Sequence, residues 1–246
     1  MGGAGATGGD GGTGGSVPPP VSLFVTVVET IPVDSDGLVP EGDPALNAPP
    51  LAGVKICESD TVNCVTSNVD GKAVLELPVN QEVAVTMEKD GYVPVIFAYL
   101  TDTTFGGDQG HYKPSNENSA VLFTEHLALA YPLQGGTIIV TTFPATTAGV
   151  TFDLVDETNE AFYFDAESRR YSFDLDATTG DPMPWNLPLA MGGFAELSPG
   201  EYEIEFGGAA DGCVGSRLAW PGRTMNSIRL PVKEGFVTFG SIGCNF

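Results

Sequence analysis

Basic residues are scarce in this sequence of 246 residues. Ten Lys and Arg stand against 32 Asp and Glu, which leaves a net charge of −22. A polyanion of this kind repels phosphate groups, so its composition argues against a nucleic-acid partner and against an anionic membrane surface. Long apolar runs are also lacking, since the nearest, Val93 to Leu100, is far shorter than the roughly 18 residues of a membrane-spanning helix. Apolar residues still make up 42% of the chain, so we expect it to fold.

Motifs for catalysis and for metal binding are scarce too. The chain has only two histidines, His111 in an expected loop and His126 in an expected helix, where structural or solvent-facing roles predominate. No Cys pair has the short ligand spacing of a zinc knuckle, and there is no Gly-x-Ser-x-Gly nucleophile elbow. Close pairs among 32 acids arise by chance and do not indicate a glycosidase. The sequence therefore predicts a protein without catalysis and without a cofactor.

The start of the chain has almost nothing to bury. Gly2 to Ser16 contain nine Gly among Ala, Thr, Asp and Ser, which is the composition of a flexible tether. No charged segment followed by an apolar one precedes it, so an export signal was removed or never present. The segment resembles the start of a mature bacterial lipoprotein in which Met1 stands for the lipid-bearing Cys. The alternative is a plain secreted protein with a ragged N-terminus.

Four cysteines make two disulfides the natural expectation for an acidic, exported chain. Cys57 ends one strand of an expected hairpin and Cys64 begins the next. Cys213 and Cys244 each follow an expected strand near the end of the chain. We predict the bridges Cys57–Cys64 and Cys213–Cys244. They indicate an extracellular or cell-surface location, either as an outer-membrane lipoprotein or on the periplasmic side.

Short β-rich runs separated by turn residues fill most of the chain. In the clearest, Glu201 to Phe206, apolar residues alternate with three Glu, which is typical of a half-buried strand. The exception runs from Asn116 to Tyr131, where apolar residues follow helical spacing until Pro132. We predict one helix there; the alternative is a strand through Ala120 to Phe123 and another through Leu127 to Tyr131.

The two halves follow one plan. Leu51 to Ile56 is similar to Thr147 to Phe152, and Leu75 to Glu82 is similar to Ala195 to Glu201. The repeat predicts a tether at residues 1–17, a first module at 18–114, a linker with a helix at 115–135 and a second module at 136–246.

The first half also resembles a known family. Ala52 to Cys57, Thr66 to Pro78, Val83 to Met87 and Lys89 to Tyr92 together resemble the carboxypeptidase regulatory-like, transthyretin-like module. That module is a non-catalytic β-sandwich of extracellular proteins, and the second half matches it only in part. The resemblance implies an all-β fold of two tandem transthyretin-like or Ig-like antiparallel β-sandwiches joined by one short helix.

Three candidate sites remain. Asp34 and Asp36 have the alternating oxygens of a short calcium loop but lack its bidentate Glu, so they are weak metal candidates. Trp185 lies in a Pro-rich insertion that no strand pattern includes, where an exposed ring could stack on a sugar. An internal Lys–Asn isopeptide is not expected, because Val21 to Glu29 and Thr137 to Phe143 contain no Lys.

The function predicted from these features is that of an exported, surface-tethered structural or adhesive binding protein. The alternative is a carbohydrate-binding accessory protein that uses the Trp185 loop. The expected partner is accordingly a polysaccharide or another surface protein.

Overall fold

The computed structural model describes residues 18–30, 35–38, 48–102, 108–114, 116–143, 148–179, 191–210 and 212–244. The first half contains β1 (Val21–Thr30), β2 (Lys55–Glu58), β3 (Cys64–Thr66), β4 (Lys72–Leu77), β5 (Gln81–Glu88), β6 (Val95–Thr101) and β7 (Asp108–Pro114). The helical segment consists of α1 (Asn116–Val121) and η1 (Leu122–His126). The second half contains β8 (Gly136–Phe143), β9 (Val150–Leu154), β10 (Phe162–Asp165), β11 (Arg170–Ser172), β12 (Met191–Leu197), β13 (Gly200–Gly208), β14 (Cys213–Gly215), β15 (Trp220–Pro221), β16 (Ser227–Val232) and β17 (Val237–Cys244). The prediction of an all-β fold with one short helix is confirmed.

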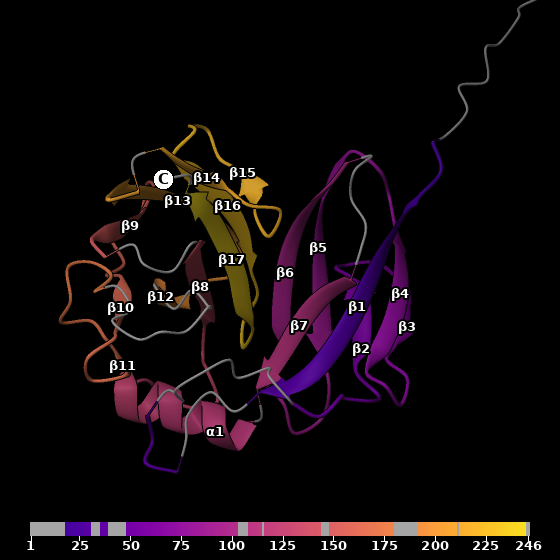
Figure 1. The fold of residues 1–246 in the computed structure, drawn as a ribbon, viewed down its shortest axis with the longest axis horizontal. Coiled ribbons are helices and arrows are strands. Elements are labelled where there is room, and N and C mark those ends of the chain that lie inside the picture. Colours follow the sequence, from indigo (N-terminus) through magenta and orange to yellow (C-terminus); the bar gives the residue numbers. More distant parts are fainter. Residues whose placement is uncertain are drawn as a thin grey trace, which may run out of the picture.

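One long sheet runs through both halves in the order β11-β10-β12-β8-β17-β6-β5-β2-β3, and β14 adds to β17. β17 lies between β8 and β6 and is parallel to both (Figure 1). The pairs Val237↔Val95 to Phe239↔Phe97 join the halves. β1 and β7 are also parallel, so the antiparallel pattern that we expected does not hold throughout. The division into modules stays a prediction, and strands on both sides of residues 115–135 share this sheet.

Two smaller sheets, β4-β1-β7 and β15-β16-β13-β9, cover opposite faces of the long sheet. Neighbouring residues of β8 show this, because successive side chains of a strand point to opposite faces. Ile139 belongs to the apolar cluster that contains the side chains of β1 and β4. Ile138 and Val140 belong to the cluster that contains those of β9, β13 and β16. Each half is thus a β-sandwich, and the two sandwiches have the long sheet in common.

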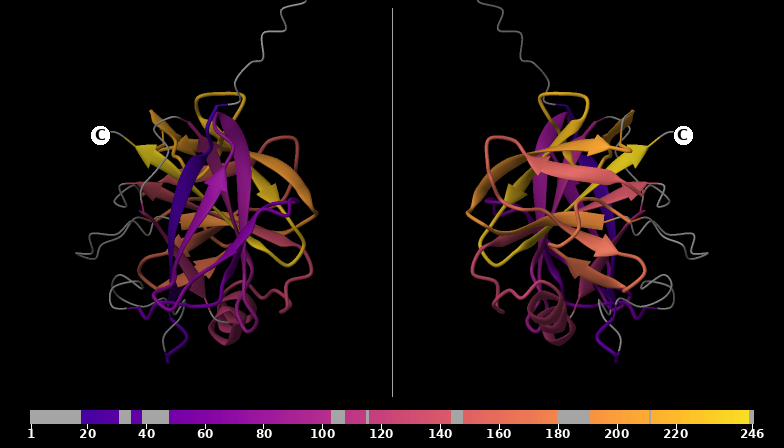
Figure 2. Two further views of the ribbon diagram at one scale, coloured as in Figure 1. Left: turned by 90° about the vertical axis from the view of Figure 1, so that its right-hand side faces the viewer. Right: turned by 90° about the vertical axis from the view of Figure 1, so that its left-hand side faces the viewer.

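The helical segment covers the part of the long sheet that β4-β1-β7 leaves open. Leu122, Phe123 and Leu127 are buried in the same cluster as Phe162 and Tyr171 from β10 and β11. Figure 2 shows the helix at the lower end of the molecule, below the strands. The helical segment ends at His126 and not at Tyr131, because the chain turns sharply at Ala128.

A left-handed residue marks that turn. Ala128 has a φ of 53°, which no residue inside an α-helix adopts. Ala130, which the helical spacing placed on the buried stripe, is exposed beyond the turn.

Both predicted disulfides are present. Cys57 and Cys64 are register partners of the β2–β3 hairpin, with Cα atoms 4.1 Å apart. Cys213 and Cys244 are register partners of β14 and β17, with Cα atoms 4.0 Å apart. Each bridge therefore ties two strands at directly opposed positions.

The strand at Gly200–Gly208 follows the predicted alternation. Ile204 and Phe206 are buried, whereas Glu201 and Glu205 are exposed.

The close approach of β12 to β8 requires a glycine at position 193. A Cβ atom on Gly193 would lie 2.0 Å from the carbonyl oxygen of Ile138, so no other residue fits without moving the strands apart.

Candidate functional site

Trp220 lies where the two halves meet. It begins β15, which pairs with β16 through Trp220↔Arg229 and Pro221↔Ile228. The indole N–H of Trp220 donates to the carbonyl oxygens of Val83 at 3.3 Å and Tyr99 at 3.1 Å. These acceptors belong to β5 and β6, so a side chain of the second half is anchored on the backbone of the first.

Arg229 forms a second bond between the halves. Its Nη1 lies 2.5 Å from Glu201 of β13, and its Nη2 pairs with Glu82 of β5. Its guanidinium carbon lies 6.0 Å from the centre of the Trp220 ring, within the range of a cation–π contact. Burial acts to lower the pKa of Arg229, but the hydrogen bonds that Arg229 donates to Glu201 and Glu82, and the charges of these carboxylates, outweigh burial and raise it. The guanidinium thus stays charged between the two halves.

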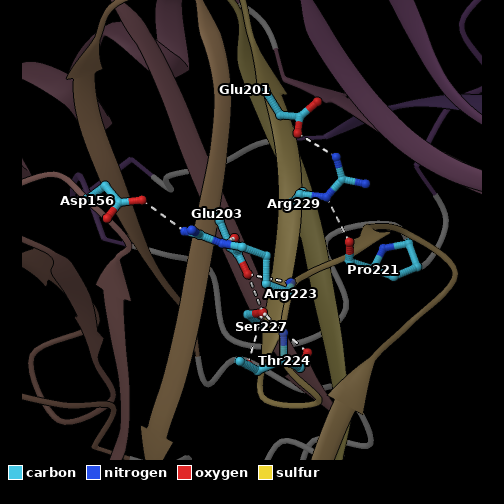
Figure 3. A network of polar contacts seen from close by, with 8 residues as sticks. All are labelled: Asp156, Glu201, Glu203, Pro221, Arg223, Thr224, Ser227 and Arg229. Carbon is cyan, nitrogen blue, oxygen red and sulfur yellow. Dashed lines mark hydrogen bonds and ion pairs between the residues drawn. The ribbon is translucent and has the colours of Figure 1, made fainter.

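Figure 3 shows a polar network on the outer face of β13 and β16, centred on Glu203. The Ser227 hydroxyl donates to Glu203 Oε1 at 2.6 Å, and the backbone N–H of Arg223 donates to the same oxygen at 2.6 Å. The Arg223 side chain pairs with Glu203 Oε2 and, at 2.9 Å, with Asp156. The network fixes the loop between β15 and β16 to the sheet.

The hydrogen bonds and ion pairs of this network suit a structural role. Burial acts to raise the pKa of Glu203, but the hydrogen bonds from Ser227 and Arg223 outweigh burial and lower it. Glu203 is therefore held ionised, and an ionised carboxylate that already accepts three hydrogen bonds is a poor base. The Ser227 hydroxyl donates a hydrogen bond to this weakly basic carboxylate and keeps its proton.

A hollow of about 480 Å³ lies next to this network. Leu100 of β6 and Asp102, just after the end of that strand, contribute to the lining, and the rest comes from the chain between Val214 and Ser227. Leu100, Val214 and Met225 line it with exposed fractions of 37%, 42% and 79%. They are three of the seven large apolar residues that are exposed in the described ranges. The hollow is therefore the candidate binding surface of the described part.

The structure leaves the candidate ligand and metal sites predicted from the sequence untested. Trp185 and Asp34 fall outside the described residues, so sugar binding by the Trp185 loop stays a prediction. Asp36 is exposed in the turn at residues 35–38. Across the described ranges, no group of three or more His, Cys, Asp or Glu is placed to hold a metal ion. Calcium binding at Asp34 and Asp36 remains an untested prediction.

Of the two histidines, His111 differs in position from the expectation, whereas His126 lies in the helical segment, as expected. His111 lies in strand β7, as the register partner of Val27, and not in a loop. The His126 Nε2 lies 2.6 Å from the carbonyl oxygen of Gly37, and its Nδ1 accepts from the Tyr171 N–H at 3.4 Å. The pKa of His126 is lowered, chiefly by burial. A neutral His126 thus joins the turn at residues 35–38 to β11.

Sequence reasoning missed the residues that join the halves. No motif or strand pattern in the sequence singles out Trp220, Arg223 or Arg229. One signal was available, because four of the ten basic residues fall between Arg217 and Lys233. In a chain this acidic, such a concentration indicates that the region makes ion pairs with acids elsewhere.

These features define a disulfide-bonded all-β protein with β-sandwich architecture. No helix in the described ranges is long and apolar enough to cross a membrane. No protein family model and no curated protein matches the chain in sequence.

Several solved structures match most of this chain at low sequence identity and with low TM-scores. The Bacillus anthracis TIE protein shares 13% identity over 92% of this chain, with a TM-score of 0.25, and this chain spans 34% of its length. The minor pilin of Streptococcus agalactiae shares 12% identity over 91% of this chain and 97% of its own, with a TM-score of 0.25. The shaft pilin SpaA of Lactobacillus rhamnosus GG shares 10% identity over 93% of this chain and 99% of its own, with a TM-score of 0.27. Similarity at this level does not transfer function from one protein to another.

Proposed function

We propose that the chain is an exported, surface-tethered, non-catalytic protein with a structural or adhesive binding role. The observation that carries this proposal is the set of backbone and side-chain contacts that join the two halves. Separate modules in one chain normally move relative to each other. Here β17 pairs with β6, Trp220 donates to β5 and β6, and Arg229 bridges Glu82 and Glu201. A rigid body that keeps a fixed distance between its surfaces suits a spacer or an adhesin.

Export is supported by the cysteines. The described residues contain all four cysteines, each in a disulfide. Disulfides persist in oxidising compartments and are rare in the cytosol. The lipid anchor and the tether of residues 1–17 belong to the same proposal.

The finer proposal is that each half is a carboxypeptidase regulatory-like, transthyretin-like module. Leu75 and Leu77, which that pattern assigns to the core, are fully buried. Gly71 and Gly91, which it assigns to turns, have φ angles of 72° and 80°. Both angles favour glycine, and together with the burial of Leu75 and Leu77 they support this proposal for the first half.

The location is tested on intact cells of the native host. A membrane-impermeant amine reagent should label the protein to the same degree before and after lysis. Alkylation of thiols before reduction should leave all four cysteines unmodified. Labelling only after lysis, or thiols that alkylate before reduction, would overturn the export proposal.

The absence of catalysis is tested separately. A fluorophosphonate probe, which labels activated serines, should not react stoichiometrically with the folded protein. Ser227 is the serine to examine first, because its hydroxyl lies 2.6 Å from a carboxylate. Stoichiometric labelling of any one serine, lost on unfolding, would show that the protein is an enzyme.

A further inference from the structure

The outer face of the small sheet β4-β1-β7 carries an exposed apolar pair. Phe24 of β1 and Val74 of β4 are register partners, with exposed fractions of 46% and 44%. Leu23, Val25 and Leu75, their neighbours along the strands, are buried. Successive side chains of a strand point to opposite faces, so Phe24 and Val74 point away from the core. Two large apolar side chains directly opposite each other on an exposed sheet face indicate a contact surface.

Opposite charges flank this apolar pair. Ser22 and Glu76 are the next register pair that points outward at one end, and Thr26 and Lys72 are the next at the other end. Lys72 and Glu76 are four residues apart on β4, or about 13 Å, which is too far for an ion pair with each other. The face therefore carries an acid, an apolar centre and a base in a line. It belongs to the side of the first half that is remote from β9 and β10 (Figure 1).

Both charges are available to another molecule. Within the described ranges, the Lys72 ammonium has no hydrogen bond and no ion pair, because only the backbone of Lys72 is bonded, to Asn68. Glu76 Oε1 accepts a hydrogen bond at 2.7 Å from the hydroxyl of Ser22. That donor is neutral, so the charge of Glu76 has no counter-charge beside it.

We infer that this face binds the same face of a second copy of the chain. Two face-to-face arrangements with two-fold symmetry bring the apolar pairs together. An axis along the strands would gather both Lys72 side chains at one end of the contact and both Glu76 side chains at the other. An axis across the strands would instead place Lys72 of each copy opposite Glu76 of the other. Charge selects the second arrangement, which also has the commonest symmetry of soluble oligomers.

The size of the face predicts a weak dimer. The ten residues of β1 span about 33 Å, and three strands are about 14 Å wide. Each copy would bury at most about 460 Å², which gives a total below the roughly 1,200 Å² of stable interfaces. The expected dissociation constant is on the order of 0.1–1 mM. Long-range repulsion between copies of charge −22 does not forbid this contact, because physiological salt screens charges more than about 8 Å apart.

A weak contact of this kind suits copies that are held on one surface. The inference gives the proposed adhesive role a partner, and it rests on that role. Flexible tethers can hold binding partners at effective concentrations of about a millimolar. A dissociation constant at or below that concentration leaves a large share of the copies dimeric.

Sedimentation equilibrium of the pure protein at physiological salt tests the inference. We expect a reversible monomer–dimer equilibrium, with dimer populated as the concentration rises from about 10 μM to about 1 mM. A monomer over the whole range would overturn the inference, but it would leave the tests of location and of catalysis as they are. A dimer of a protein that fails the test of location would overturn the proposed function alone.

Two charge reversals test the ion pairs. Lys72→Glu and Glu76→Lys each put like charges opposite each other across the axis, so each should weaken dimerisation at least about tenfold. Glu76→Lys separates this effect from general repulsion, because it lowers the net negative charge and would by repulsion alone strengthen the dimer. An equimolar mixture of the two variants should recover, since both charge contacts of the mixed dimer are then opposite. If Glu76→Lys dimerises as well as the native protein, or if the mixture does not recover, the inference is wrong.

Val74→Lys tests the apolar centre, and Val214→Lys is its matched control. Val214 is a strand valine of the second half with a nearly equal exposed fraction of 42%. The same change should weaken the dimer at least about tenfold at Val74 and leave it intact at Val214. Circular dichroism and melting temperatures confirm that each variant is folded. Equal weakening by the two substitutions would show that the contact lies elsewhere and would contradict the inference.

Discussion

Removing each disulfide should lower stability by an amount set by the loop that the disulfide closes. The changes are Cys57→Ala with Cys64→Ala, and Cys213→Ala with Cys244→Ala. The sequence separations are 7 and 31 residues. Loop-closure entropy then gives a loss of about 2.5 kcal/mol for the first bridge and about 3.7 kcal/mol for the second.

Burial should widen the difference. Cys213 and Cys244 are buried in the second apolar cluster, whereas Cys64 is exposed at the edge of the long sheet. The second pair of substitutions therefore also removes packed sulfur atoms. For a chain of this length, the expected fall in melting temperature is about 5–10 °C for the first pair and about 7–15 °C for the second.

Thermal and urea unfolding, followed by circular dichroism, measure both variants against the native protein. If the free energy of unfolding falls with urea at an unchanged slope and the midpoint is lower, the substitutions have changed stability alone. The reasoning is refuted if the Cys57–Cys64 variant loses as much stability as the Cys213–Cys244 variant, or more. Reduction of the native protein provides the control, because it should reproduce the combined loss.

Three further predictions use the same unfolding measurements. Trp220→Phe keeps an aromatic ring but loses the indole N–H, and it should lower the free energy of unfolding by about 1 kcal/mol. An unchanged urea midpoint would contradict the role of the indole N–H in joining the two halves. Gly193→Ala forces β12 away from the Ile138 carbonyl and should cost about 3 kcal/mol or more, seen as a large fall in melting temperature. Because the pKa of His126 is lowered in the folded protein, the unfolded chain takes up a proton first, so stability should fall as the pH drops below about 6.5. Melting temperatures at neutral and mildly acidic pH should differ less in His126→Gln than in the native protein.

Local features of the sequence predicted local features of the fold. The strand at Gly200–Gly208 was recognisable because its apolar residues and its glutamates alternate over the whole length. The disulfides were recognisable because each cysteine stands at the end of a strand. In both cases the information lies within a few residues, and it does not depend on what packs against them.

Features that depend on distant segments were not predictable in this way. The sequence of β17 does not say that its neighbours are β6 and β8, which lie far away in the sequence. The helix ends early because the chain must turn at Ala128, although the apolar spacing continues. The binding role of Trp185 stays a prediction, whereas the joining role of Trp220 became visible only once β5 and β6 were in place beside it.

The central position of β17 bears on how the chain is made. Of the strands described, β17 is synthesised last, yet β8 and β6 both need it to complete their pairing. Until it arrives, β6 has an open edge that attracts other strands. Contacts between segments so distant in sequence also slow folding. Strands β6 and β8 therefore each remain without one of their two neighbours until β17 has been synthesised, and the long sheet that joins the two halves can form only after that point.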